Sequence, residues 1–133
     1  MSNGIEYSIE ILPEDIPIRG SFDSGDAQAD EEQALDIERQ LARGNDWAWC
    51  TVKVVATLGR FAGCDYLGAC SYANEEEFKA PGGYYEQMCE EAARDLLSTL
   101  RLAVDAAQAA KTGIALVERA LAMLQTQNNS GSP

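Results

Sequence analysis

Residues 47–58, WAWCTVKVVATL, and residues 61–73, FAGCDYLGACSYA, decide the fold of this chain. Both stretches are rich in aromatic and β-branched residues, which favour strands. Only a short turn around Gly59 and Arg60 separates them, so they are predicted to pair as a β-hairpin. A slip of one residue would exchange the two faces of each strand, and the composition leaves this register open.

Alternation along the first strand indicates which of its faces is buried. The more uniformly apolar face carries Ala48, Cys50, Val52, Val54, Ala56 and Leu58. The other face carries Trp47, Trp49, Lys53 and Thr57. We therefore expect the first face to form the core and the second to be partly exposed.

Before the hairpin, the sequence predicts one strand and one helix. Residues 5–12 alternate apolar and polar side chains at period two, which is typical of a half-buried strand. Residues 27–43 carry an apolar stripe at helical spacing. Asp26 is the expected N-cap of this helix, and Gly44 is expected to end it in a left-handed conformation.

A long helical pattern follows the hairpin, from Tyr84 to about Gln127. Unbroken, it would reach roughly 60 Å at 1.5 Å per residue, too long to lie on a small three-stranded sheet. Either it breaks near residues 111–113 and folds back as a hairpin, or its second half packs on another chain. The apolar residues expected to self-associate in the second case are Ile114, Val117, Leu121 and Leu124.

The predicted fold is α+β, in the order β-α-β-β-α. A three-stranded antiparallel sheet is packed by helices, with a long or broken C-terminal helix. Residues 1–110 are expected to form an acidic α+β domain, and residues 111–127 a helical extension of it. Residues 128–133 are expected to be a disordered tail.

Negative charge is concentrated in the first 95 residues, which hold 20 of the 22 acidic and seven of the ten basic side chains, a net charge of −13. Such a field repels nucleic acid and membrane surfaces and attracts a Lys/Arg-rich protein surface, which is the predicted partner. The predicted contact residues are Asp23, Asp26, Asp30, Glu31, Glu32, Trp47, Trp49, Glu75, Glu76, Glu77, Glu86, Glu90 and Glu91. With no apolar leader and no uninterrupted apolar run of about 20 residues, a cytoplasmic protein is expected.

Catalytic and metal-binding patterns are weak throughout the chain. Histidine, the commonest proton shuttle near pH 7, does not occur. Asp46 and Asp65 have no recognisable relation to a nucleophile, and the acidic run from Asp23 to Glu32 does not have the ligand spacing of an EF-hand. We therefore expect no enzyme activity, no cofactor and no metal.

The four cysteines are Cys50, Cys64, Cys70 and Cys89. No C-x-x-C pair is present, which argues against zinc. Buried, reduced thiols are the main expectation, because a free cysteine behaves as a small apolar residue. A cross-strand disulfide between Cys50 and Cys70 under oxidation remains the alternative.

Four segments resemble a family of small acidic proteins of conjugative plasmids, integrative elements and phages, often encoded near antirestriction genes. They are residues 12–20 (LPEDIPIRG), 44–50 (GNDWAWC), 65–72 (DYLGACSY) and 82–86 (GGYYE). The likeness covers roughly residues 5–100, implies a genetic setting on a mobile element, and carries over no catalytic residue.

Charge and resemblance together predict a non-enzymatic inhibitor, either anti-CRISPR or antirestriction. It would act as a DNA mimic on a basic surface of a host defence complex, blocking nucleic-acid binding or subunit assembly. The alternative is a structural or adaptor module that forms a homodimer through its apolar C-terminal helix, with the acidity serving solubility.

Overall fold

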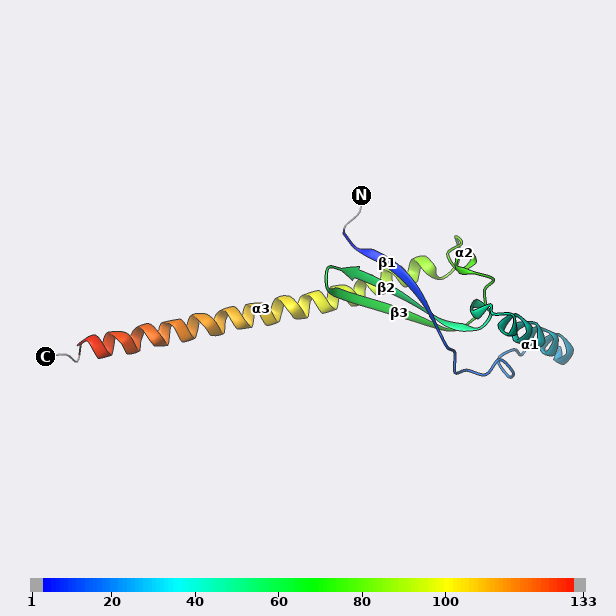
Figure 1. Ribbon diagram of the computed structural model, residues 1–133, viewed down its shortest axis with the longest axis horizontal. Coiled ribbons are helices and arrows are strands. Elements are labelled where there is room, and N and C mark those ends of the chain that lie inside the picture. Colours follow the sequence, from blue (N-terminus) through cyan, green and yellow to red (C-terminus); the bar gives the residue numbers. More distant parts are fainter. Residues whose placement is uncertain (1–3, 131–133) are drawn as a thin grey trace. The chain divides into compact units, whose positions relative to one another are not determined.

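Three antiparallel strands, in the order β1-β2-β3, form the single sheet seen in Figure 1. They are β1 (Glu6–Leu12), β2 (Cys50–Leu58) and β3 (Phe61–Cys70). This computed structural model describes residues 4–130, with side chains up to Gln127. The predicted α+β class and β-α-β-β-α order are confirmed.

The buried face of the sheet is the one that the sequence predicts. Cys50, Val52, Val54 and Ala56 are all buried, whereas the residues between them on β2 are only half-buried. The β2–β3 register places Leu58 opposite Phe61 and Val52 opposite Leu67, which settles the hairpin alignment that the sequence left open, and Ile9 of β1 lies opposite Val54. Apolar side chains of neighbouring strands therefore lie on one face.

The first turns of α3 (Tyr85–Ser130) pack on the sheet. Met88, Ala92 and Leu96 are buried along one side of the helix. The backbones approach closely at Gly63 of β3, where an added Cβ would lie 2.1 Å from the amide nitrogen of Leu96. Only glycine permits this contact between strand and helix.

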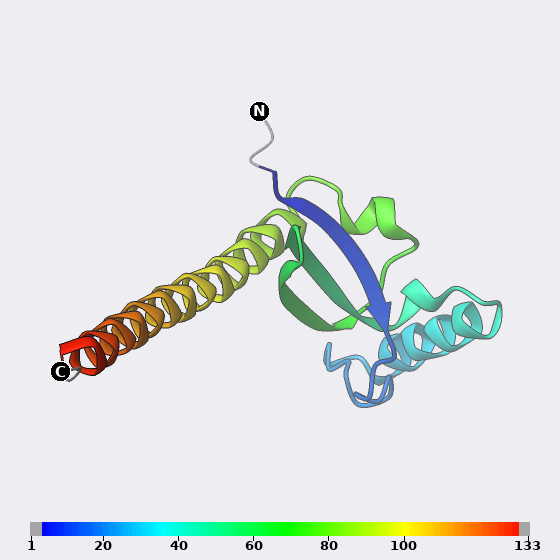
Figure 2. The same cartoon turned by 60° about the vertical axis from the view of Figure 1, so that its left-hand side comes forward.

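Helix α1 (Ala27–Ala42) begins and ends as predicted. The Asp26 carboxylate accepts hydrogen bonds from the backbone N–H groups of Gln28 and Ala29, which would otherwise be unsatisfied at the helix start. Gly44 follows the helix with φ of +92°, a left-handed conformation that glycine adopts without strain. In Figure 2, α1 lies beyond the end of the sheet at which β2 begins.

Two short helices were not predicted. Residues 46–48 form the 3₁₀ helix η1 (Asp46–Ala48) rather than the start of β2, because the Ala48 N–H bonds back to the Asn45 carbonyl. Helix α2 (Glu75–Phe78) occupies the predicted acidic link after β3. Its cap is the Asn74 side chain, which accepts from the Glu77 N–H.

Helix α3 runs without a break through Gly113, so the predicted hairpin at residues 111–113 is wrong. A glycine inside a helix costs only about 1 kcal/mol relative to alanine, which neighbouring good helix formers tolerate. Residues 128–130 of the expected disordered tail continue α3, and residues 131–133 lie outside the described part.

The chain divides into two compact units at Leu97 and Ser98, whereas the sequence placed its boundary at residue 110. We call residues 4–97 the sheet unit and residues 98–130 the helical unit. The sheet unit contains every strand and the start of α3, and the helical unit is the rest of α3.

Candidate partner-binding surface

The sheet unit carries its negative charge on its surface. It holds 20 acidic and seven basic side chains, a net charge of −13. No charged side chain is buried in the part of the chain that the structure describes. Carboxylates in ion pairs are those of Glu10, Glu31, Glu38, Glu75 and Glu91. Because seven basic side chains cannot neutralise 20 acidic ones, the surface of the sheet unit keeps a large net negative charge.

The α1 acidic group consists of Asp23, Asp26, Asp30, Glu31 and Glu32, around the start of α1. Several of its members have local structural roles. Asp26 caps the helix, and the Asp30 carboxylate accepts hydrogen bonds from the Ser24 hydroxyl at 2.7 Å and from its N–H. Glu31 pairs with Arg19. The Glu32 carboxylate accepts a hydrogen bond from the Gln28 side-chain amide at 3.3 Å, and Asp23 is exposed.

The α2–α3 acidic group consists of Glu75, Glu76, Glu77, Glu86, Glu90 and Glu91. Glu75 forms an ion pair with Lys79 at 3.8 Å, and Glu91 pairs with Arg94. Glu76, Glu86 and Glu90 are fully on the surface. The predicted acidic contact residues therefore lie in two groups, one around the start of α1 and one on α2 and the start of α3.

Four aromatic side chains connect η1, the end of β3, α2 and α3. Phe78 is 1% exposed and lies at the centre, with ring centroids 5.8 Å from Trp47, 5.2 Å from Tyr72 and 5.9 Å from Tyr85. This aromatic cluster packs α2 and the start of α3, which carry the α2–α3 acidic group, against η1 and the residues that follow β3. Trp47 is half-buried within it, which agrees with the partial exposure expected for its face, and its role as a partner contact stays a prediction.

Trp49 is also a core residue rather than a partner contact. Its side chain packs against Phe22, with ring centroids 6.0 Å apart, and the residue is 8% exposed. The indole N–H donates to the Ile16 carbonyl at 2.8 Å. Trp49 therefore holds the loop before α1 against the sheet unit, and burial removes it from the binding surface.

Sequence reasoning missed Glu14, which organises the end of the hairpin. One of its carboxylate oxygens accepts the Ala69 N–H at 2.9 Å, and the other accepts the Thr51 hydroxyl. Ala69 has φ of +52°, a left-handed conformation that alanine rarely adopts, and it lies at a register shift between β2 and β3. The only local signal was a position between two prolines, Pro13 and Pro17, which Glu14 shares with Asp15.

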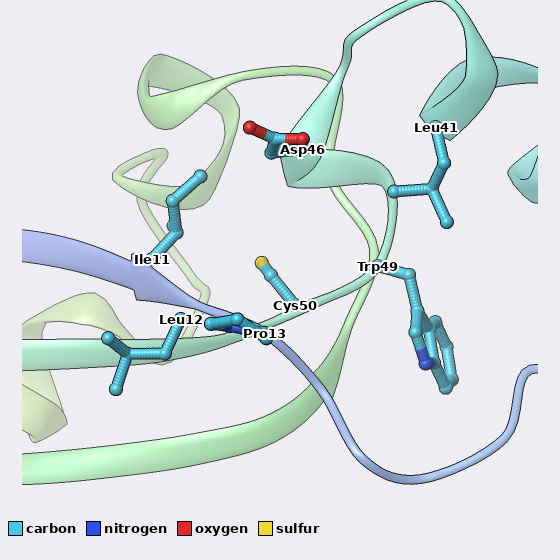
Figure 3. A pocket seen from close by; sticks show the side chains of 7 residues that line it. All are labelled: Ile11, Leu12, Pro13, Leu41, Asp46, Trp49 and Cys50. Carbon is cyan, nitrogen blue, oxygen red and sulfur yellow. The ribbon is translucent and has the colours of Figure 1, made fainter.

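A surface pocket of about 300 Å³ lies between the end of β1, α1 and η1 (Figure 3). Its lining is Ile11, Leu12, Pro13, Leu41, Asp46, Trp49 and Cys50. Burial raises the pKa of the Cys50 thiol to about 11, so this sulfur is protonated near neutral pH and is a poor nucleophile. The Asp46 carboxylate and a protonated thiol do not form an activated pair.

All four cysteines are free thiols. Cys50 and Cys70 lie opposite each other in the β2–β3 register, and both are buried. Burial also raises the pKa of Cys70. The disulfide between these two residues under oxidation stays a prediction.

The helical unit exposes large apolar side chains over its whole described length. Ile114, Val117, Leu121 and Leu124, the residues predicted to self-associate, are each more than half exposed. Leu102, Leu116 and Met123 are exposed as well. These side chains form a second candidate surface, of opposite chemical character to the acidic groups.

Within residues 4–130, no three His, Cys, Asp or Glu side chains come together as ligands for a metal ion. No helix in that range combines the length and the apolar character that crossing a membrane requires. No protein-family model, curated protein or solved structure matches the chain.

Proposed function

We propose that the chain is a non-enzymatic inhibitor that binds a Lys/Arg-rich surface of a complex that handles nucleic acid. The observation that carries this proposal is the net charge of −13 on the sheet unit, displayed by exposed carboxylates. Opposite charge accelerates encounter with a cationic surface and releases the ions condensed there. The bound inhibitor would exclude nucleic acid or a subunit from that surface.

The resemblance to proteins of mobile elements specifies the target further. A host defence complex, either a CRISPR effector or a restriction enzyme, presents basic surfaces for nucleic acid. An acidic protein expressed by an incoming element would occupy such a surface before the element's own DNA does. The α2–α3 acidic group is the centre of the proposed contact, because the aromatic cluster holds its elements in place.

The direct test is phage or plasmid survival in hosts that carry one defence system each. Expression of the chain should restore plating efficiency in at least one of these hosts. The charge-neutral variant Glu76→Gln/Glu86→Gln/Glu90→Gln should lose the effect. Glu6→Gln/Asp15→Asn/Asp105→Asn removes the same charge from exposed positions outside both acidic groups and should retain it.

The physical signature of the contact is its salt dependence. Once the target is purified, its binding should weaken steeply from about 0.05 to 0.5 M salt, because screened charges attract less. Affinity that does not change over this range would refute the charge-based mechanism. Unchanged plating in every defended host would refute the inhibitor function itself.

A second candidate function is a structural or adaptor module that self-associates through the helical unit. The exposed apolar side chains of that unit favour it. Truncation after residue 110 distinguishes the two functions. If the truncated chain becomes monomeric but still inhibits, the acidic surface acts alone; if both properties disappear, assembly is required.

A further inference from the structure

The helical unit carries a seven-residue repeat of apolar side chains. Steps of three and four residues alternate without interruption from Leu100 to Leu124. The repeat consists of Leu100, Ala103, Ala107, Ala110, Ile114, Val117, Leu121 and Leu124. Their average spacing of 3.5 residues is that of a coiled-coil seam, so we call these residues the seam.

From Ala107 to Leu124 the seam has the composition of a packed interface but the exposure of a free surface, whereas Leu100 and Ala103 are half-buried. Ile114 is 59% exposed and Leu124 58%, whereas Leu96, earlier on the same helix, is 1% exposed. An isolated helix is marginally stable in water, because most helical stability in proteins comes from packing of an apolar face. The seam therefore calls for a covering partner.

Side-chain size along the seam points to a second copy in antiparallel orientation. The first half of the seam is mainly alanine, and the second half consists of large aliphatic residues. If Ile114 faces Val117 of a second copy, then Ala110 faces Leu121, and Ala107 faces Leu124. From Ala107 to Leu124, every layer then joins a small side chain to a large one or a β-branched pair, so the spacing between helices stays uniform over these layers.

A parallel pair would pack much less evenly. It would stack alanine on alanine at one end and leucine on leucine at the other. Interior packing tolerates neither voids nor crowding at close to crystal density. The distribution of volume thus favours the antiparallel alignment over the parallel one.

The charges beside the seam fit the same register. Lys111 and Glu118 flank it on one side. In the antiparallel alignment, Lys111 lies two residues from the level of Glu118 of the second copy, about 3 Å along the axis. The symmetric pair forms at the same time. On the other flank, Gly113 and Ala120 of the second copy come together, and both are small enough for close approach.

Net charge selects orientation as well. The helical unit holds three basic and two acidic side chains, so two copies of it do not repel each other. Each attached sheet unit carries −13. Antiparallel pairing connects the two sheet units to opposite ends of the helix pair, whereas parallel pairing connects both to one end and raises their Coulombic repulsion.

We propose that residues 107–124 form an antiparallel two-stranded coiled coil with a second copy of this chain, centred between Ile114 and Val117. This inference rests on the second candidate function, self-association, and adds the orientation and the register. Leu102, Leu116 and Met123 lie outside the seam and stay available for lateral pairing of two dimers. The assembly therefore contains an even number of chains.

Charge reversal in the full-length chain tests the register. Lys111→Glu places two like-charge pairs in the dimer, and so does Glu118→Lys. Each single variant should raise the dimer dissociation constant roughly tenfold. The double variant Lys111→Glu/Glu118→Lys restores opposite charges and should recover the affinity of the unmodified chain. Arg119→Glu makes the same charge change as Lys111→Glu on the face opposite the seam and should have little effect.

Sedimentation equilibrium over a range of concentrations measures these constants. A monomer at all concentrations, or an odd number of chains, would overturn the proposal together with self-association as a function. An even assembly that weakens no more with Lys111→Glu than with Arg119→Glu would overturn the register alone. Failure of the double variant to recover the affinity would do the same.

Discussion

The two parts of α3 have the same kind of apolar pattern and opposite surroundings. In the sheet unit, Ala92 and Leu96 are buried, and their backbones lie against Gly63 of β3. In the helical unit, Leu121 and Leu124 continue the pattern but are more than half exposed. Periodicity therefore predicts that a helix face will be covered, but it does not identify the chain that covers it.

Charge separates the two units in a complementary way. The sheet unit carries −13 and has a buried apolar core of its own. The helical unit is close to neutral and presents its apolar side chains outward. Each unit thus offers a different kind of contact, ionic in the first and apolar in the second. The predictions below test this division.

The largest expected effect is that of Gly63→Ala. The added Cβ would lie 2.1 Å from the Leu96 amide nitrogen and 2.6 Å from the Ala92 carbonyl oxygen, so α3 must move off the sheet. We expect the free energy of unfolding to fall by more than about 3 kcal/mol, measured by urea denaturation. Gly113→Ala, which adds a methyl group in open space, should not destabilise the chain. Equal effects at both glycines would contradict the account.

Leucine truncation compares the two parts of α3 directly. Leu96→Ala should lower the free energy of unfolding by about 2–5 kcal/mol at any protein concentration, because it opens a cavity in the core. Leu121→Ala should change stability by less than about 0.5 kcal/mol where the chain is monomeric. It should weaken self-association instead. Thermal denaturation over a range of concentrations separates these outcomes, and a concentration-independent loss at Leu121 would show that its partner is in the same chain.

Asp26→Ala distinguishes structural from available carboxylates within the acidic surface. Loss of the two hydrogen bonds at the start of α1 should lower the free energy of unfolding by about 1 kcal/mol. Asp23→Ala removes the same charge nearby, but Asp23 makes no cap, so this variant should be close to neutral. Similar losses for the two variants, measured by chemical denaturation, would mean that the cap contributes little.

The smallest expected effect is a pH dependence that comes from the core of the sheet unit. Burial raises the pKa of Cys50 to about 11 from the ordinary value of 9.0. Between these values the folded chain keeps a proton that the unfolded chain loses, so the free energy of unfolding should fall as pH rises from 9 to 11. Cys50→Ala should make this slope shallower, and the raised pKa of the buried Cys70 keeps part of it. An unchanged slope in Cys50→Ala would assign the effect to other groups.

Much of the fold follows from local sequence patterns. The period-two face of β2, the Asp26 cap and the Gly44 terminus were all predicted and are all present. Local rules suffice here because each feature depends on neighbours within a few residues. The short helix η1 was missed because Trp47 and Trp49 have high strand propensity, and tertiary packing of both indoles overrides it.

For the candidate surface, the sequence predicted the kinds of residues but not their arrangement in space. Sequence identified the acidic residues, but not which of them cap a helix or form ion pairs, nor that the aromatic cluster would hold α2 beside η1. Glu14 was missed because its partners, Thr51 and Ala69, are distant along the chain. Contacts of this kind depend on the complete fold, so no local pattern signals them.

Hydrogen exchange of the full-length chain at several concentrations tests the division between the two units most directly. We predict that amides of β2 are equally protected at every concentration, because their cover lies within the chain. Protection over residues 100–127 should be weak in the monomer and rise as the chain associates. Strong, concentration-independent protection of residues 100–127 would contradict the account, because it would show that the helical unit is stable without a second copy.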